Sequence, residues 1–206
     1  GTLMAGILYQ QDSFDSQEAD NWAVFFHGVF NLTDQLSLTA GVRYTDDQKV
    51  ARISRHNFDG TDRLPVPGFT TQTSPGTVIV DEDKVSPTLG IDYQMSDNVL
   101  LFALYSTGFR GGGFSPRPSN GLQLAPFLSE ELENLEVGVK SELADNSVRL
   151  NANLFFSTYT DQQVFLGTTD ASGAIWFHQT NSGESEYMGV EVETQWRPGD
   201  SFALDS

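Results

Sequence analysis

Hydrophobic and polar residues alternate along much of this chain, and the longest alternating stretch is residues 131–160. Both halves of the stretch are apolar at every second position, and the polar segment 144–147 separates them. The apolar positions are Leu135, Val137, Val139, Val148, Leu150, Ala152, Leu154 and Phe156. A period of two predicts strands with one apolar and one polar face. We therefore expect a long antiparallel hairpin with a tight turn at 144–147.

The same period predicts further strands on both sides of this hairpin. They are expected at 2–9, 21–31, 36–45, 88–95, 99–106 and 185–197, with a last one beginning at 202. With the two hairpin arms, this gives roughly nine strands. The stretch 99–106 is apolar at nearly every position, so its pattern does not assign its side chains to a face.

The predicted connections alternate between short and long. The short ones are 31–35, 96–98, 144–147 and 197–201, and the long ones are 10–20, 46–83, 107–129 and 160–183. Within the last of these, Ile175, Trp176 and Phe177 can form a short strand. Short turns at one end and long loops at the other are typical of an outer-membrane β-barrel. A soluble sandwich more often mixes loop lengths at both ends.

Aromatic residues lie near the predicted strand ends. Those toward the long connections are Tyr9, Trp22, Tyr44, Tyr105 and Tyr159, and those toward the short turns are Phe30, Tyr93 and Trp196. Two such belts suit the two interfaces of a bilayer. An apolar strand face covers either a soluble core or lipid, and this distribution favours lipid.

Composition excludes several classes of function. No apolar stretch approaches the roughly 20 residues that a transmembrane helix needs. The 206 residues carry 28 acidic and 11 basic side chains, a net charge of −17, which argues against a nucleic-acid partner. There is no cysteine, the three histidines are scattered, and no nucleophile-elbow or catalytic-triad spacing appears. We therefore expect that the protein is not an enzyme and that it has neither a cofactor nor a metal site.

The long connections contain the candidate ligand-binding residues. They are Phe109, Arg110, Phe114 and Arg117 around the GlyGlyGly segment 111–113, and Trp176 and His178 further on. Arginine can bind a carboxylate or phosphate through two parallel hydrogen bonds, and aromatic rings can stack on a ligand. The competing interpretation is structural: the glycines shape a strand end, and the aromatic residues belong to a surface turn. The acidic run 81–83 either binds a cation or is part of a solvated loop.

Charged residues at the polar positions of the strands form a second group. They are Arg43, Glu136, Lys140, Arg149, Glu191 and Glu193, and we expect them to line the wall of a water-filled lumen.

Four segments resemble, in order, the barrel of a TonB-dependent outer-membrane receptor. They are FNLTDQLSLTAGVRYTDDQK (30–49), VSPTLGIDYQMSDNVLLFALYSTGFRGGGF (85–114), FLSEELENLEVGVKSELADNSVRLNANLFFSTYTDQQV (127–164) and YMGVEVETQW (187–196). The resemblance implies an all-β, antiparallel up-and-down transmembrane barrel with short periplasmic turns and long extracellular loops. It implies location in the outer membrane of a Gram-negative bacterium, in contact with lipid.

The resemblance also implies active uptake of a scarce nutrient, above all a ferric siderophore, driven by the TonB energy-transducing complex. Family barrels have about 22 strands, so residues 1–206 are expected to be part of a barrel domain. The N-terminal plug domain, which carries the TonB contact, and the C-terminal strands are expected to lie elsewhere. The alternative is a soluble antiparallel β-sandwich that acts as a binding or adhesion module, and a β-rich hydrolase is a remote third.

Overall fold

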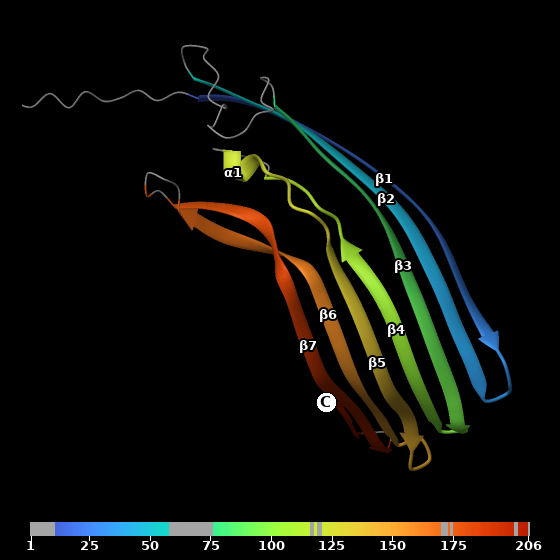
Figure 1. Ribbon diagram of the computed structural model, residues 1–206. Coiled ribbons are helices and arrows are strands. Elements are labelled where there is room, and N and C mark those ends of the chain that lie inside the picture. Colours follow the sequence, from blue (N-terminus) through green and yellow to red (C-terminus); the bar gives the residue numbers. More distant parts are fainter. Residues whose placement is uncertain are drawn as a thin grey trace, which may run out of the picture.

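The computed structural model describes residues 11–57, 76–115, 118, 121–169, 173, 175–199 and 202–205. These residues form one eight-stranded antiparallel sheet in which each strand pairs with its neighbours in sequence (Figure 1). The strands are β1 (Gln11–Asn31), β2 (Leu36–Asn57), β3 (Gly76–Ser96), β4 (Val99–Arg110), β5 (Glu130–Leu143), β6 (Val148–Thr169), β7 (Ile175–Gly199) and β8 (Phe202–Asp205). One short helix, α1 (Gly121–Leu124), lies between β4 and β5.

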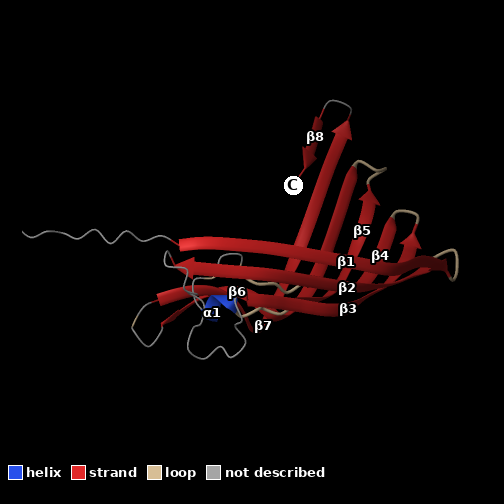
Figure 2. Cartoon of the chain, turned by 90° about the horizontal axis from the view of Figure 1, so that it is seen from above, coloured by secondary structure: helices blue, strands red, loops and turns tan. Residues whose placement is uncertain are grey.

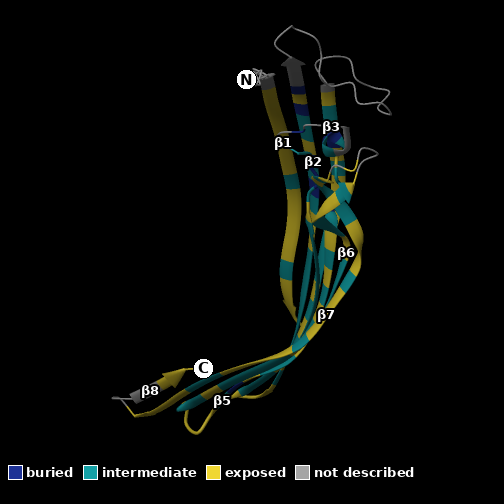
Figure 3. Ribbon diagram, turned by 90° about the vertical axis from the view of Figure 1, so that its left-hand side faces the viewer, coloured by how far each residue is buried: buried dark blue, intermediate teal, exposed yellow. Residues whose placement is uncertain are grey.

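The sheet is a single curved layer. Figures 2 and 3 show no second sheet packed on either of its faces within the described part of the chain. A sandwich requires a second sheet, so the alternative prediction is wrong, and the predicted up-and-down antiparallel arrangement is confirmed. No helix among the described residues is long and apolar enough to cross a membrane.

The tight turns lie at one end of the sheet, which we call the turn end. Residues 32–35, 97–98 and 144–147 connect consecutive strands there, as the sequence predicts. Positive φ angles at Ala144, Asp145 and Asn146 (51°, 53° and 66°) let the third turn reverse the chain. The opposite end carries the longer connections, and we call it the loop end.

The strands extend much further toward the loop end than predicted. Segment 10–20 is not a loop, because Gln11–Asp20 pair with Gln48–Asn57. Segments 46–57 and 76–83 likewise belong to β2 and β3, while 58–75 lie outside the described residues. In the last long connection, β6 continues to Thr169 and β7 begins at Ile175, so the possible strand at 175–177 is part of a longer one. The predicted strand 2–9 also lies outside the described residues.

The strand register sorts the side chains into two faces. Directly paired residues share a face, and one such row across seven strands is entirely apolar. It contains Phe30, Leu38, Ile91, Ala103, Val137, Leu154 and Val190. Large members of this apolar face are exposed, among them Val190 at 66% and Leu154 at 53%. No described part of the chain covers this face.

The register also settles the strand whose facing the sequence left open. Leu101, Ala103 and Tyr105 of β4 are on the apolar face, so Phe102 and Leu104 are on the opposite, polar face.

The aromatic belts are only partly as expected. Trp22 and Tyr44 share the apolar face, with ring centres 5.3 Å apart. Tyr159 pairs with Leu132 on the polar face and packs edge-on against Tyr187 at 5.6 Å, so its assignment to the belt is wrong. Tyr9 lies outside the described residues.

A small buried cluster lies at the loop end. Ala51 and Ile53 of β2 are 2% exposed and pack with Leu124 of α1, and Val78 and Phe114 border them. The connection between β4 and β5 therefore packs against the sheet instead of projecting from it.

Candidate ligand-binding face

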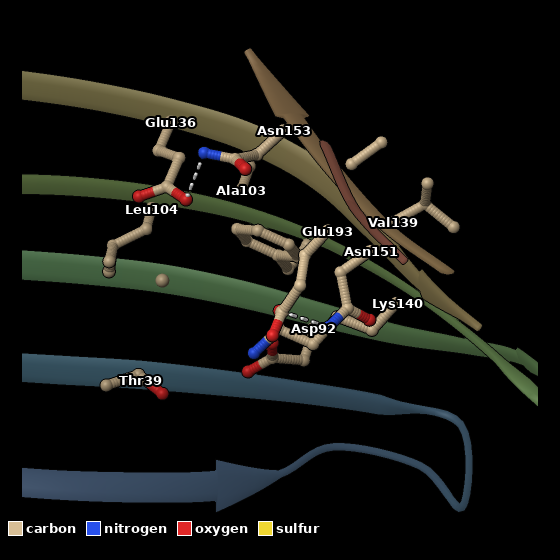
Figure 4. A pocket seen from close by; sticks show the side chains of 13 residues that line it. Thr39, Asp92, Ala103, Leu104, Glu136, Val139, Lys140, Asn151, Asn153 and Glu193 are labelled. Atoms are coloured by element: carbon tan, nitrogen blue, oxygen red, sulfur yellow. Dashed lines mark hydrogen bonds between the residues drawn. The ribbon is translucent and has the colours of Figure 1, made fainter. Parts of the chain in front are cut away.

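The polar face of β2 to β7 forms a concavity of about 500 Å³. Figure 4 shows its lining side chains, which come from β2, β3, β4, β5, β6 and β7. The strand register brings them together, because polar positions that are far apart in sequence fall in the same rows. One row runs through Asp92, Phe102, Gly138, Asn153 and Glu191.

Hydrogen bonds between neighbouring strands hold the side chains of this face in place. Asn153 donates to Glu136 at 2.9 Å and to Glu191 at 3.3 Å. Asn151 donates to Glu193 at 3.1 Å. Each asparagine amide thus orients carboxylates that point away from the sheet, and the row presents an acidic, hydrogen-bonding surface.

An aromatic ring lies within this polar surface. The ammonium group of Lys140 is 5.3 Å from the centre of the Phe102 ring, within the range of a cation–π contact. The ring lies over Gly138, where a Cβ would be only 2.7 Å from Phe102 and 2.6 Å from the carbonyl oxygen of Ala152. Glycine is therefore required at 138 for this ring position.

The other charged residues expected in a lumen wall are on the same face. Arg149 pairs with Glu142 at 2.7 Å near the turn end, and Arg43 donates to Thr45 at 3.0 Å toward the loop end. The six predicted wall residues thus lie on one face, where Glu136 and Glu191 share Asn153 as a hydrogen-bond donor and Arg43 and Arg149 make separate contacts. Their role as a lumen wall stays a prediction.

The candidate ligand-binding residues are at the loop end and do not converge on one site. Phe109 lines a small hollow bordered by β3, β4 and β5. The side chain of Arg110 is 68% exposed, with a nitrogen 3.8 Å from Glu130. Phe114 is half-buried against the Ala51–Ile53 cluster, and this favours the structural interpretation at that position. Arg117 lies outside the described residues.

Trp176 and His178 lie on one face of β7, near its first residue. Both are half-buried, and Nδ1 of His178 is buried with no hydrogen-bond partner in the described part of the chain. A ligand role for these residues stays a prediction. No group of three or more His, Cys, Asp or Glu residues suited to a metal ion occurs among the described residues.

Several residues of the polar face are not among the predicted site residues. Asn151, Asn153 and Asp92 occupy polar positions of predicted strands, and that alternation was the available signal. Phe102 was not identifiable, because its strand is apolar at nearly every position. Glu82 was assigned to a loop, but it lies in β3 and binds the connection between β4 and β5.

A single antiparallel sheet with an exposed apolar face and a concave polar face is the wall of a transmembrane β-barrel. The family model described as "TonB dependent receptor-like, beta-barrel" matches residues 2–206, and the chain belongs to this family. The family resemblance seen in the sequence is thereby confirmed. Barrels of this family are located in the outer membrane of Gram-negative bacteria, and they are receptors and transporters, not enzymes.

Individual relatives are similar over most of this chain. The pesticin receptors of Yersinia enterocolitica and Yersinia pestis are each 28% identical over 189 residues, which cover 91% of this chain and 25% of the receptor. Among solved structures, the ferric yersiniabactin uptake receptor FyuA from Yersinia pestis has a TM-score of 0.73 at 23% identity, covering 95% of this chain and 27% of that chain.

The siderophore receptor PiuA from Acinetobacter baumannii has a TM-score of 0.65 at 18% identity and covers 93% of this chain and 25% of that chain. These structural similarities show the fold. The chain spans about a quarter of the length of the relatives that it matches.

Proposed function

We propose that this chain forms part of the barrel of an outer-membrane receptor that takes up a ferric siderophore with energy supplied through TonB. One observation carries the proposal: the sheet separates a mostly apolar face, with one entirely apolar row across seven strands, from a concave face of ordered carboxylates, amides and one cation–π pair. The inter-strand hydrogen bonds of Asn151 and Asn153 hold the carboxylates of Glu193, Glu136 and Glu191 in place on the concave face. The names of the relatives support the ligand class, since one is described as a siderophore receptor and another as a ferric yersiniabactin uptake receptor.

We propose that the apolar face contacts outer-membrane lipid and that the polar face lines the lumen. Single rows of apolar side chains with exposures such as 53% and 66% are costly in water but not against acyl chains. The bilayer also forbids unpaired backbone groups, so β1 and β8 require further strands as partners.

The rest of the receptor supplies those strands in this proposal, together with the plug domain and the TonB contact. Its support is the greater length of the relatives, of which this chain covers about a quarter.

Uptake of radiolabelled iron by cells that produce the intact receptor tests this function. With a panel of ferric siderophores, we expect uptake of at least one that is lost when either the receptor or TonB is removed. Uptake that is independent of TonB, or that is unchanged without the receptor, would contradict the proposal.

A matched pair of arginine variants then tests where the ligand binds. Arg110 is mostly exposed at the loop end, whereas Arg149 is already paired with Glu142 near the turn end. We expect Arg110→Ala to weaken siderophore binding and Arg149→Ala to leave it unchanged. Equal effects of the two variants on siderophore binding would contradict the assignment of Arg110 to the binding site.

A further inference from the structure

The sheet divides at the loop end. Hydrogen-bonded pairing between β3 and β4 stops at Thr88 and Ser106, although β3 extends back to Gly76 and β4 continues to Arg110. The next residue of β3 is Pro87, which has no N–H to donate to a ladder. Beyond this point the strands form a β2–β3 arm (42–57 and 76–87) and a β6–β7 arm (160–169 and 175–184), with α1 between them in Figure 1.

A segment of the β4–β5 connection lies in this division. We call residues 111–115 and 123–129 the strap. Its two limbs are joined by a bridge in which Gly113 and Phe127 each donate to the other's carbonyl oxygen at 2.9 Å. The strap is therefore a paired backbone element, and its remaining N–H and carbonyl groups can form hydrogen bonds with the two arms.

The strap is attached to the β2–β3 arm through charged side chains. One carboxylate oxygen of Glu82 accepts from the Gly112 N–H at 2.7 Å, and the other accepts from the Ser129 N–H at 2.8 Å. Lys49 donates to the Gly112 carbonyl oxygen at 2.8 Å and to Asp47 at the same distance. Gly112 is buried and Ser129 is 5% exposed, so their N–H groups depend on Glu82 for a partner.

The strap is attached to the β6–β7 arm through neutral amides. Asn181 accepts from the Leu128 N–H at 2.7 Å and donates to the Leu128 carbonyl oxygen at 2.9 Å, as a paired strand would. Gln163 donates to the carbonyl oxygens of Leu128 at 3.0 Å and Gly111 at 3.1 Å. The same short element thus binds both arms.

The glycines of the strap allow its backbone to lie close to the β2–β3 arm and to its own second limb. A Cβ at Gly112 would be 2.5 Å from the Phe127 carbonyl oxygen and 3.0 Å from Glu82. At Gly111 it would be 2.6 Å from Asp47. The GlyGlyGly segment therefore has a contact role that a flexible loop would not require.

We propose that the strap is a built-in tie that fixes the distance between the two arms at the mouth of the barrel, and that Glu82 is its positioning residue. Two backbone amides converge on one carboxylate, and charge-assisted hydrogen bonds of this kind are the strong ones. An ion pair between Lys84 and Glu131 crosses the same division but does not touch the strap. The strap acts with or without a ligand, so it does not depend on the siderophore proposal.

Amide hydrogen exchange in the intact receptor, folded in lipid, tests the tie. Glu82→Gln keeps the shape but replaces one acceptor by a donor, so the N–H of Gly112 or Ser129 loses its partner. We expect exchange in the strap to become faster by about tenfold or more, with β5 and the first half of β6 unchanged. Asp81→Asn is the matched control, since Asp81 is the adjacent, exposed residue on the other face of β3, and it should leave exchange unchanged.

Spin labels at exposed positions Thr77 and Phe165, one on each arm, give a second readout. We expect Glu82→Gln to broaden the distance distribution between them, and Asn181→Ala to do the same from the other arm. The Asn181 variant provides the test if the Glu82 variant does not assemble. Unchanged distances and unchanged strap exchange in an assembled variant, or equal changes in Asp81→Asn, would overturn the proposal.

Discussion

Replacing Leu154 by arginine places a charge on the apolar face at a depth that the structure allows us to estimate. Leu154 lies six residues along β6 from Val148, the first residue of the strand. At a rise of about 3.3 Å per residue and a tilt of about 45°, this is about 14 Å from the turn end, near the middle of an apolar band about 25 Å tall. Its neighbours in the row, Val137 and Val190, offer the new charge no partner.

We expect Leu154→Arg to lower the free energy of unfolding from a bilayer by about 2 to 4 kcal/mol, the cost of arginine at the midplane. Leu150→Arg, at only about 5 Å from the turn end by the same arithmetic, should cost about 1 kcal/mol or less. The control is Asn153→Arg, on the polar face between Glu136 and Glu191, where the guanidinium can pair with carboxylates. It should change stability by less than about 1 kcal/mol.

The assay is denaturant unfolding of the intact receptor in phospholipid bilayers. Equal losses for Leu154→Arg and Asn153→Arg would refute the assignment of faces. A loss at Leu150 as large as that at Leu154 would refute the depth estimate while leaving the faces intact.

Three further variants and one control, Gly108→Ala, test local contacts by the same unfolding measurement. Gly138→Ala forces a Cβ against a ring and a backbone oxygen and should cost about 1 to 3 kcal/mol, whereas Gly108→Ala, with nothing within 4 Å of its added Cβ, should be close to neutral. Trp22→Ala removes the ring contact with Tyr44 and should cost about 0.5 to 1.5 kcal/mol beyond its lost burial. Arg149→Ala breaks an ion pair that is half-exposed on both sides, so its effect should stay within about 1 kcal/mol. A costly Gly108→Ala or a neutral Gly138→Ala would contradict the packing described.

The sequence predicted the part of the sheet that separates two different media. Between the turns and the middle of each strand, one face is apolar and the other polar, so a period of two appears, as in 36–45 and 148–156. The three tight turns at 32–35, 97–98 and 144–147 and the order of the described strands followed from it. The facing of Phe102 did not, because both faces of β4 carry apolar side chains.

The parts of the strands at the loop end show no such alternation. Gln11–Asp20 pair with β2 along their full length, yet residues 15–20 are all exposed, so polar residues are suitable on both faces. Backbone hydrogen bonds stabilise this part of the sheet, and the pattern of hydrophobic residues does not predict them. Loop predictions at 10–20 and 46–57 failed for that reason.

The strap depends on contacts between residues that are distant in the chain. Glu82 meets Gly112 and Ser129, 30 and 47 residues away, and Asn181 meets Leu128, 53 residues away. Only the run of three glycines pointed to a close backbone approach, and it did not name the partners.

The central claim is that lipid contacts the apolar face and water the polar face. The most direct test is spin labelling of single-cysteine variants at successive positions from 149 to 156 on β6, which is practical because this chain has no cysteine of its own. In the intact receptor in bilayers, we predict that labels at even positions are accessible to oxygen and that labels at odd positions are shielded from it. Labels accessible to a water-soluble nickel reagent at the even positions, or no alternation along the strand, would contradict the claim.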